Sequence, residues 1–124
     1  MKILVVEDNA IIGYDLVAML EDWGYVAKGP LPSNEEALAE IAAFVPDAVI
    51  LDIQLKGGVL SDPVADDLTR RGIPFLCLTG FDSDLYDQMP AFADVPHLEK
   101  PMGNEALRNA IQALLGSRCT CTAA

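Results

Sequence analysis

The stretch Ala48-Val-Ile-Leu-Asp52 places an acidic residue directly after four apolar ones. Two similar apolar runs, Ile3-Leu-Val-Val6 and Phe75-Leu-Cys-Leu78, also lack any alternation with polar residues. Such short continuous runs are typical of strands that are buried on both faces of a parallel sheet. Weaker candidates at Tyr25-Val-Ala27 and at residues 95–98 bring the expected number of strands to five.

Apolar residues at helical spacing occupy the segments between these strands. Capping residues, prolines and glycines at their ends predict where each helix begins and stops. The expected helices are residues 12–23 before Gly24, residues 34–45 after a capping box at Ser33, residues 63–71 after a cap at Asp62, and residues 104–115 before Gly116. A short or irregular helix is expected near residues 84–89, before Pro90.

Strands that alternate with helices predict a doubly wound α/β sandwich of three layers with right-handed crossovers. The strand order 2-1-3-4-5 is taken from known folds of this size. A chain of 124 residues is long enough for one domain with a sizeable core. We expect that domain to span residues 1–116, followed by a short flexible tail at 117–124.

The charge balance argues against some classes of partner. Eight Lys and Arg stand against nineteen Asp and Glu, a net charge of −11. Such a surface repels nucleic acid and anionic lipid, so a protein partner is expected, with no nucleic acid and no membrane. No apolar run approaches the roughly 18 residues of a membrane span, and we expect a cytoplasmic protein.

The three cysteines do not predict a disulfide framework. Cys77 lies inside an apolar run, whereas Cys119 and Cys121 lie in the small polar tail. We expect reduced thiols in a frayed tail, and metal binding or redox sensing by Cys-Thr-Cys remains the alternative.

Several polar residues follow the apolar runs at the point where each strand should end. They are Glu7, Asp8, Asp52, Thr79 and Lys100. The carboxyl ends of parallel strands share one edge of the sheet, so these side chains should converge although they are distant in sequence. Mg²⁺ prefers a few carboxylates, with water and substrate phosphate completing its shell. The pattern therefore predicts a Mg²⁺ and phosphoryl site.

Asp52, Thr79 and Lys100 can each act in phosphoryl transfer. The Asp52 carboxylate can attack phosphorus to give an acyl phosphate. A Thr79 hydroxyl and a Lys100 ammonium would neutralise the oxygens of the bound phosphoryl group. Taken singly, simpler interpretations stay open: Glu7 and Asp8 could merely cap a helix, and the other two could be a turn hydroxyl and a surface charge.

The motifs Ile3-Leu-Val-Val-Glu-Asp8, Val49-Ile-Leu-Asp52, Leu78-Thr79-Gly80 and Lys100-Pro101 together resemble, in order and spacing, the landmarks of response-regulator receiver domains. The resemblance covers residues 2 to about 115 and implies a flavodoxin-like (βα)5 fold.

The resemblance also implies roles for individual residues. Asp52 would be the phosphoacceptor, and Thr79 and Lys100 would contact the phosphoryl group. Mg²⁺ would be held by Glu7, Asp8, Asp52 and the main-chain carbonyl of Gln54. The donor would be a sensor histidine kinase or a phosphotransfer protein. The chain would then be a signalling protein, a monomer or weak dimer, and not an enzyme that turns over a small-molecule substrate.

Some positions depart from or qualify the family pattern. Lys56 stands where the family often has proline, and His97 stands at the position of its aromatic switch residue. We expect the His97 ring to be neutral and packed, so an aromatic swing at this switch position is in doubt. Gln54 and Phe81 flank the expected path of attacking water and should tune the lifetime of the phosphoryl group.

A narrower resemblance joins Pro74-Phe-Leu-Cys-Leu-Thr-Gly-Phe81 with Asp62-Pro-Val-Ala-Asp66. Both are similar to the stand-alone FAT GUY-type receivers of alphaproteobacteria, which implies a single-domain regulator acting by protein contacts or as a phosphate relay or sink. A receiver-like binding module that does not depend on phosphate is the alternative. A small Mg²⁺-dependent phosphohydrolase is less favoured, because Gln54 stands where such enzymes carry a second acid.

Overall fold

A computed structural model of the chain describes residues 1–53, 55, 59–79, 97–99 and 104–123. For Thr79, for residues 97–99, for Asn104 and for residues 116–123 it describes the backbone alone. The strands are β1 (Lys2–Val6), β2 (Val26–Leu31), β3 (Ala48–Asp52), β4 (Phe75–Thr79) and β5 (His97–Glu99). The helices are α1 (Ala10–Asp22), α2 (Asn34–Phe44), α3 (Asp62–Arg71) and α5 (Asn104–Ala123).

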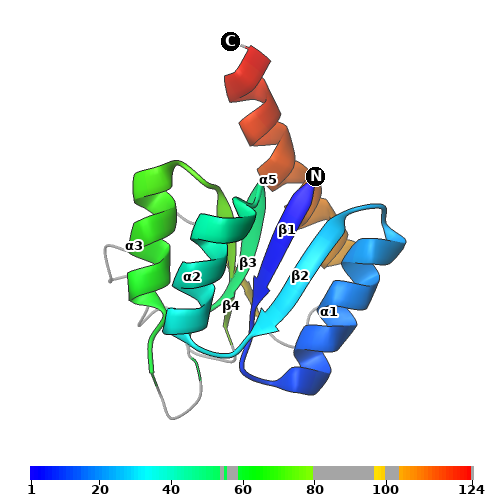
Figure 1. Ribbon diagram of the computed structural model, residues 1–124. Coiled ribbons are helices and arrows are strands. Elements are labelled where there is room, and N and C mark those ends of the chain that lie inside the picture. Colours follow the sequence, from blue (N-terminus) through cyan, green and yellow to red (C-terminus); the bar gives the residue numbers. More distant parts are fainter. Residues whose placement is uncertain (54, 56–58, 80–96, 100–103, 124) are drawn as a thin grey trace.

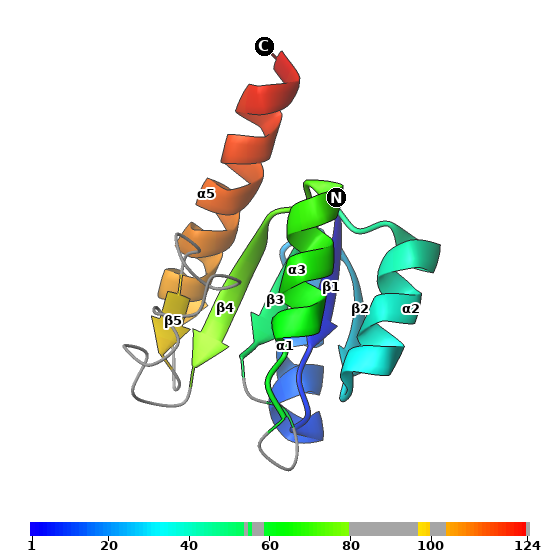
Figure 2. The ribbon, with the colours of Figure 1, turned by 90° about the vertical axis from the view of Figure 1, so that its left-hand side faces the viewer.

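All five strands pair in parallel in the order β2-β1-β3-β4-β5, as predicted. Helices α2 and α3 cover one face of the sheet, and α1 and α5 cover the other (Figures 1 and 2). The three-layer α/β sandwich of the flavodoxin-like kind is therefore confirmed. Among the described residues, none of the helices is long and apolar enough to cross a membrane.

Apart from Lys2 and Asp52 at their ends, the central strands β1 and β3 are apolar because their alternate residues enter two different cores. On β1, Leu4 and Val6 pack toward α2 and α3, whereas Ile3 and Val5 pack toward α1 and α5. β3 repeats this alternation, and all five of its residues are buried. A period of two with both faces covered produces the continuous apolar runs of the sequence.

The predicted helix starts are confirmed in part. α1 begins at Ala10 and not at the predicted residue 12, and Asn9 caps it by accepting a hydrogen bond from the Ile12 amide at 3.2 Å. The predicted cap at Ser33 is confirmed, because its side chain accepts from the Glu36 amide at 3.2 Å. The predicted cap at Asp62 is wrong, because Asp62 is the first residue of α3 and Ser61 occupies the capping position.

The predicted end of the last helix is also wrong. α5 does not stop at Gly116 but continues to Ala123, and its final turns extend beyond the sheet (Figure 1). An interior glycine costs a helix about 1 kcal/mol relative to alanine, yet it keeps its backbone hydrogen-bond donor, so it weakens a helix without ending it. The division into a domain of residues 1–116 and a tail of 117–124 stays a prediction. The short helix expected near residues 84–89 lies outside the described residues.

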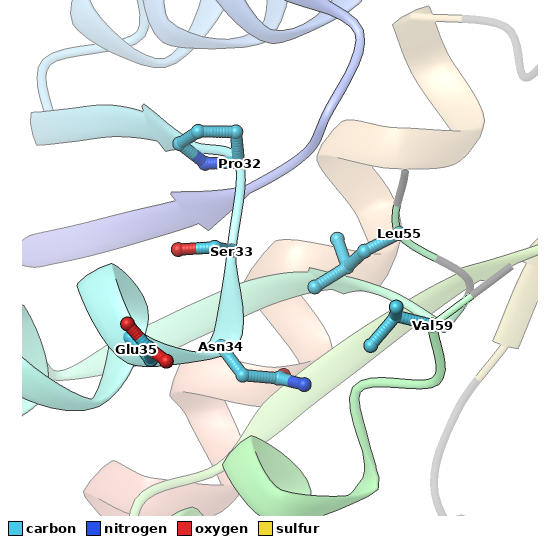
Figure 3. Close-up of a pocket in the computed structure, with 6 residues that line it drawn as sticks. All are labelled: Pro32, Ser33, Asn34, Glu35, Leu55 and Val59. Carbon is cyan, nitrogen blue, oxygen red and sulfur yellow. The ribbon is translucent and has the colours of Figure 1, made fainter. Parts of the chain in front are cut away.

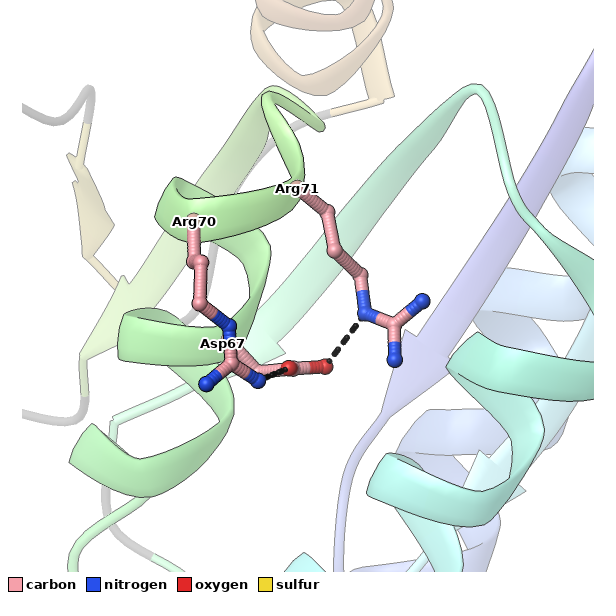
Figure 4. Close-up of polar contacts among 3 residues, drawn as sticks. All are labelled: Asp67, Arg70 and Arg71. Carbon is pink, nitrogen blue, oxygen red and sulfur yellow. Dashed lines mark hydrogen bonds and ion pairs between the residues drawn. The ribbon is translucent and has the colours of Figure 1, made fainter.

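Helix α3 carries a buried acidic residue that is paired with two arginines. Arg71 Nε donates to Asp67 Oδ2 at 2.9 Å, and Arg70 donates to the other carboxylate oxygen (Figure 4). Burial raises the pKa of Asp67, but the hydrogen bonds and charges of Arg71 and Arg70 outweigh it and leave the pKa below its ordinary value. The ionised carboxylate is thus the stabilising form.

We predict that Asp67→Asn lowers the free energy of unfolding by about 1 kcal/mol at neutral pH, a modest value because both arginines are partly exposed. Since the folded pKa is depressed, this contribution is present above the ordinary pKa of about 3.8 and is lost as the pH falls through the folded pKa. Urea unfolding between pH 7 and pH 3 measures it, with the exposed neighbour Asp66→Asn as control. A destabilisation of Asp67→Asn that is unchanged at pH 3 would contradict this assignment.

α1 approaches β2 closely at Gly13. A Cβ atom at Gly13 would lie 2.3 Å from Pro30 Cβ and 2.5 Å from Pro30 Cγ. These separations are far shorter than any real carbon contact, and a proline ring cannot swing away as a long side chain can. The absence of a side chain at Gly13 therefore allows α1 to lie directly on the sheet.

We predict that Gly13→Ala destabilises the fold by about 1–3 kcal/mol through overpacking, although alanine is the better helix former. Urea unfolding monitored by circular dichroism measures this. Ala18→Gly, at an exposed position of the same helix, calibrates helix propensity alone. A Gly13→Ala protein more stable than the wild type would show that no close approach exists here.

Candidate metal centre

Three carboxylates meet at the carboxyl ends of β1 and β3, which are neighbours in the sheet. Glu7 and Asp8 directly follow β1, and Asp52 is the last residue of β3. One carboxylate oxygen from each lies within 4.8 Å of the others. Glu7 and Asp52 are buried, at 1% and 4% exposure, and Asp8 is half-buried. The predicted convergence of these acids is confirmed.

The main chain holds the Glu7 side of the cluster in place. The Glu7 amide donates to the Leu31 carbonyl at 3.0 Å, at the end of the β1–β2 pairing where Val6 lies opposite Leu31. The Asn9 amide donates to Glu7 Oε1 at 3.2 Å, and the Asn9 side chain caps α1. Asn9 thus links the metal centre to the helix start, a role that sequence reasoning missed although an Asn three residues before Ile12 is a capping signal.

The Asp52 side is held from β4 and from the start of α3. The amide of Ile53 donates to the Leu78 carbonyl at 3.1 Å. The Ser61 hydroxyl lies 2.6 Å from the Asp52 carbonyl. Sequence reasoning missed Ser61 as well, because a serine just before a helix is indistinguishable from an ordinary cap.

The electrostatics of the cluster favour a bound cation. At a separation of 4.8 Å and an effective dielectric constant of about 20, two negative charges repel by roughly 3 kcal/mol before screening by solvent. Carboxylate oxygens are the ligands that Mg²⁺ prefers, and an incomplete protein shell leaves room for water and a phosphate oxygen. The donor set therefore fits Mg²⁺ and does not fit a soft metal, which prefers thiolate and imidazole.

Cys77, on the neighbouring strand β4, lies near enough to Asp52 for the negative charge to affect the pKa of its thiol. Burial, together with the charge of Asp52, raises the pKa of the Cys77 thiol to about 12. The thiol stays protonated at neutral pH and is neither a ligand nor a nucleophile.

The other residues predicted for the site are placed only in part. Thr79 ends β4, and the register pairs Asp52 with Leu78, so the Thr79 backbone lies at the same edge of the sheet as the acids. His97 begins β5, where its backbone pairs with Cys77. The structure does not describe the side chains of these two residues. Gln54, Phe81 and Lys100 lie outside the described residues, so their predicted roles stay predictions.

A separate groove of about 590 Å³ lies between the start of α2 and the segment that joins β3 to α3 (Figure 3). Its lining residues are Pro32, Ser33, Asn34, Glu35, Leu55 and Val59. Asn34 Nδ2 donates to the Leu60 carbonyl at 3.1 Å and so ties the two sides of the groove together. None of the three clustered carboxylates lines it, so it is distinct from the metal centre.

Comparisons with known proteins identify the class. No protein-family model matches the chain. The chain is 32% identical over 118 residues to the two-component response regulator PhoP of Pseudomonas aeruginosa, covering 93% of this chain and 52% of PhoP. The solution structure of SdrG from Sphingomonas melonis Fr1 is similar, with 37% identity, a TM-score of 0.79 and coverage of 93% of this chain and 96% of SdrG.

A third similar protein shares the fold. The receiver domain of sensor histidine kinase PA1611 from Pseudomonas aeruginosa, solved with magnesium coordinated in its active-site cleft, shares the fold at a TM-score of 0.78 and 23% identity, covering 93% of this chain and 97% of that domain. The chain spans about half the length of the curated relatives that it matches. The chain belongs to the response-regulator receiver domains, a family of signalling regulators.

We predict that millimolar Mg²⁺ raises the thermal midpoint of the wild-type protein, because a ligand that binds only the folded state stabilises it by mass action. At about one hundred times the dissociation constant, the gain is about 2.7 kcal/mol. Asp8→Asn should lose most of this gain, since it removes the negative charge of the half-buried carboxylate in the cluster. Differential scanning fluorimetry with and without Mg²⁺ measures both.

Glu21→Gln is the charge-matched control, because Glu21 is exposed at the far end of α1. It should respond to Mg²⁺ as the wild type does. An equal response of Asp8→Asn and Glu21→Gln would mean that Mg²⁺ acts on general surface charge and not at the cluster.

Proposed function

We propose that this chain is a stand-alone response regulator whose Asp52 accepts a phosphoryl group from a histidine kinase or a phosphotransfer protein. The observation that carries the proposal is the cluster of Glu7 and Asp8 around Asp52 at the carboxyl end of β3. The regulator would then signal through protein contacts, or pass on or drain phosphate as a relay or sink.

The chemistry at Asp52 is a phosphoryl transfer. A carboxylate oxygen of Asp52 forms the new bond to phosphorus while the bond from phosphorus to the donor's imidazole nitrogen breaks, and the electron pair leaves with the imidazole. With an exposure of only 4%, Asp52 reacts in a site with little competing water. Its strand position fixes the nucleophile before the donor arrives, so little of its conformational entropy remains to be lost in the reaction.

Mg²⁺, when bound, would neutralise charge that develops on the transferred phosphoryl oxygens. Glu7, Asp8 and Asp52 would hold it, together with the main-chain carbonyl of Gln54. The fit of the carboxylate oxygens to this ion supports the assignment.

Thr79 and Lys100 would contact the remaining phosphoryl oxygens through a hydroxyl and an ammonium. The strand-end position of the Thr79 backbone beside Asp52 supports its part of this proposal. A Thr79 hydroxyl drawn toward the phosphate would shift the loop that follows β4, which gives the phosphorylated protein a different surface. His97 would be a packed switch residue, and Gln54 and Phe81 would tune the phosphoryl lifetime.

The stand-alone role rests on two supports. The similarity to SdrG covers 93% of this chain and 96% of SdrG. The motifs at residues 62–66 and 74–81 resemble those of the stand-alone FAT GUY-type receivers. A net charge of −11 also favours a protein partner over nucleic acid. We propose a monomer or weak dimer that acts by binding proteins.

We predict that acetyl phosphate with Mg²⁺ adds one phosphoryl group to the wild-type protein and none to Asp52→Asn, whose amide is not a nucleophile. Intact-mass spectrometry of freshly labelled protein measures this. Asp66→Asn, at an exposed site, should be labelled like the wild type.

Equal labelling of Asp52→Asn and the wild type would refute the assignment of Asp52. Continuous release of phosphate from a phosphomonoester would instead indicate a phosphohydrolase. Binding of partners with an affinity that phosphorylation leaves unchanged would indicate the phosphate-independent binding module.

A further inference from the structure

We infer that Ser61 is a positioning residue for Asp52, an inference that rests on the proposed phosphoacceptor function. Ser61 is fully buried, at 0% exposure, just before α3. Its hydroxyl donates to the Asp52 carbonyl at 2.6 Å and also lies 3.1 Å from the Ile53 carbonyl. A residue nine positions away in sequence therefore holds the main chain of the phosphoacceptor.

The direction of the Ser61 side chain is not that of an ordinary helix cap. A capping serine accepts a hydrogen bond from an amide in the first turn of its helix. The Ser61 side chain makes no such bond, and the amides of Val64 and Ala65 are instead bonded to its carbonyl at 3.0 and 3.1 Å. The hydroxyl therefore bonds to the end of β3 and not to α3.

The bonds around Asp52 fix both polar groups of a single peptide unit. The Asp52 carbonyl accepts from the Ser61 hydroxyl, and the adjoining Ile53 amide donates to the Leu78 carbonyl at 3.1 Å. The Ser61 amide also donates to the Ile53 carbonyl at 2.9 Å. With both polar groups of this peptide bonded, the main chain of Asp52 is held at the strand end from which its carboxylate reaches the cluster with Glu7 and Asp8.

Three substitutions separate the effect of the Ser61 hydrogen bond from the effect of side-chain volume. Ser61→Ala removes the hydroxyl, Ser61→Cys keeps a similar volume but only a weak donor, and Ser61→Thr keeps the hydroxyl. Outer partners of metal ligands change affinity by about tenfold or more when removed, so Mg²⁺ should bind Ser61→Ala and Ser61→Cys about tenfold more weakly than the wild type. Ser61→Thr should restore most of this affinity. Isothermal titration calorimetry with Mg²⁺ measures it on proteins shown to be folded by circular dichroism.

Ser33→Ala is the matched control. It removes a serine hydroxyl that accepts from the Glu36 amide at the start of α2 and has no hydrogen bond to the Asp52 peptide. Its Mg²⁺ affinity should stay within about twofold of the wild type, because the lost bond fixes no metal ligand. An equal loss in Ser33→Ala and Ser61→Ala would show that the effect does not depend on the contact with Asp52 and would overturn the role of Ser61.

The wild-type protein supplies a second measurement that needs no variant. Because coupling is reciprocal, a metal that benefits from the Ser61 contacts must also strengthen them. Mg²⁺ should therefore slow hydrogen exchange of the Ile53 and Ser61 amides, and unchanged exchange rates with Mg²⁺ bound would contradict the inference.

The outcomes distinguish this inference from the proposed function. If the wild type neither binds Mg²⁺ nor takes up phosphate, the proposed function fails. If the wild type does both and Ser61→Ala matches it in Mg²⁺ affinity and in the rate of labelling by acetyl phosphate, only the role of Ser61 fails.

Discussion

The register between β1 and β3 is the constraint on which the rest of the structure depends. Val6 pairs with Leu51, so the next residues along the two strands are the acids Glu7 and Asp52. Residues 3–6 and 48–51, which precede the acids, are apolar because both faces of the sheet are covered by helices. A slip of one residue would exchange the two faces of a strand and separate the acids, so the same burial that stabilises the fold also fixes the site.

The acids are held at a cost in stability that the surrounding structure has to offset. Buried carboxylates close to one another repel, and a protein tolerates them when they serve a function and when other groups hold them in place. Two of the contacts that hold them are a hydrogen bond from the Asn9 amide to Glu7 and one from the Ser61 hydroxyl to the Asp52 carbonyl. A bound cation would turn the remaining repulsion into attraction, which connects the local electrostatics to the proposed phosphoryl chemistry.

The sequence predicts this fold well because its signals are local. Continuous apolar runs mark β1, β3 and β4, and the topology alone then brings Glu7, Asp8 and Asp52 together. Where prediction failed, the deciding interaction was either non-local or weak. The Ser61 hydroxyl turns toward β3 through a contact that no spacing reveals, and Gly116 lowers helix stability without ending α5. The approach of Gly13 to Pro30 is equally a tertiary contact, invisible from either residue alone.

The most direct test of the central claim is to locate the phosphoryl group chemically. Borohydride reduces an aspartyl phosphate to homoserine, and peptide mass spectrometry of the reduced protein identifies the residue that carried it. After treatment with acetyl phosphate and Mg²⁺, the account predicts homoserine at position 52 alone, and none when the metal is chelated. Homoserine at another acidic residue, or equal conversion without metal, would contradict the account.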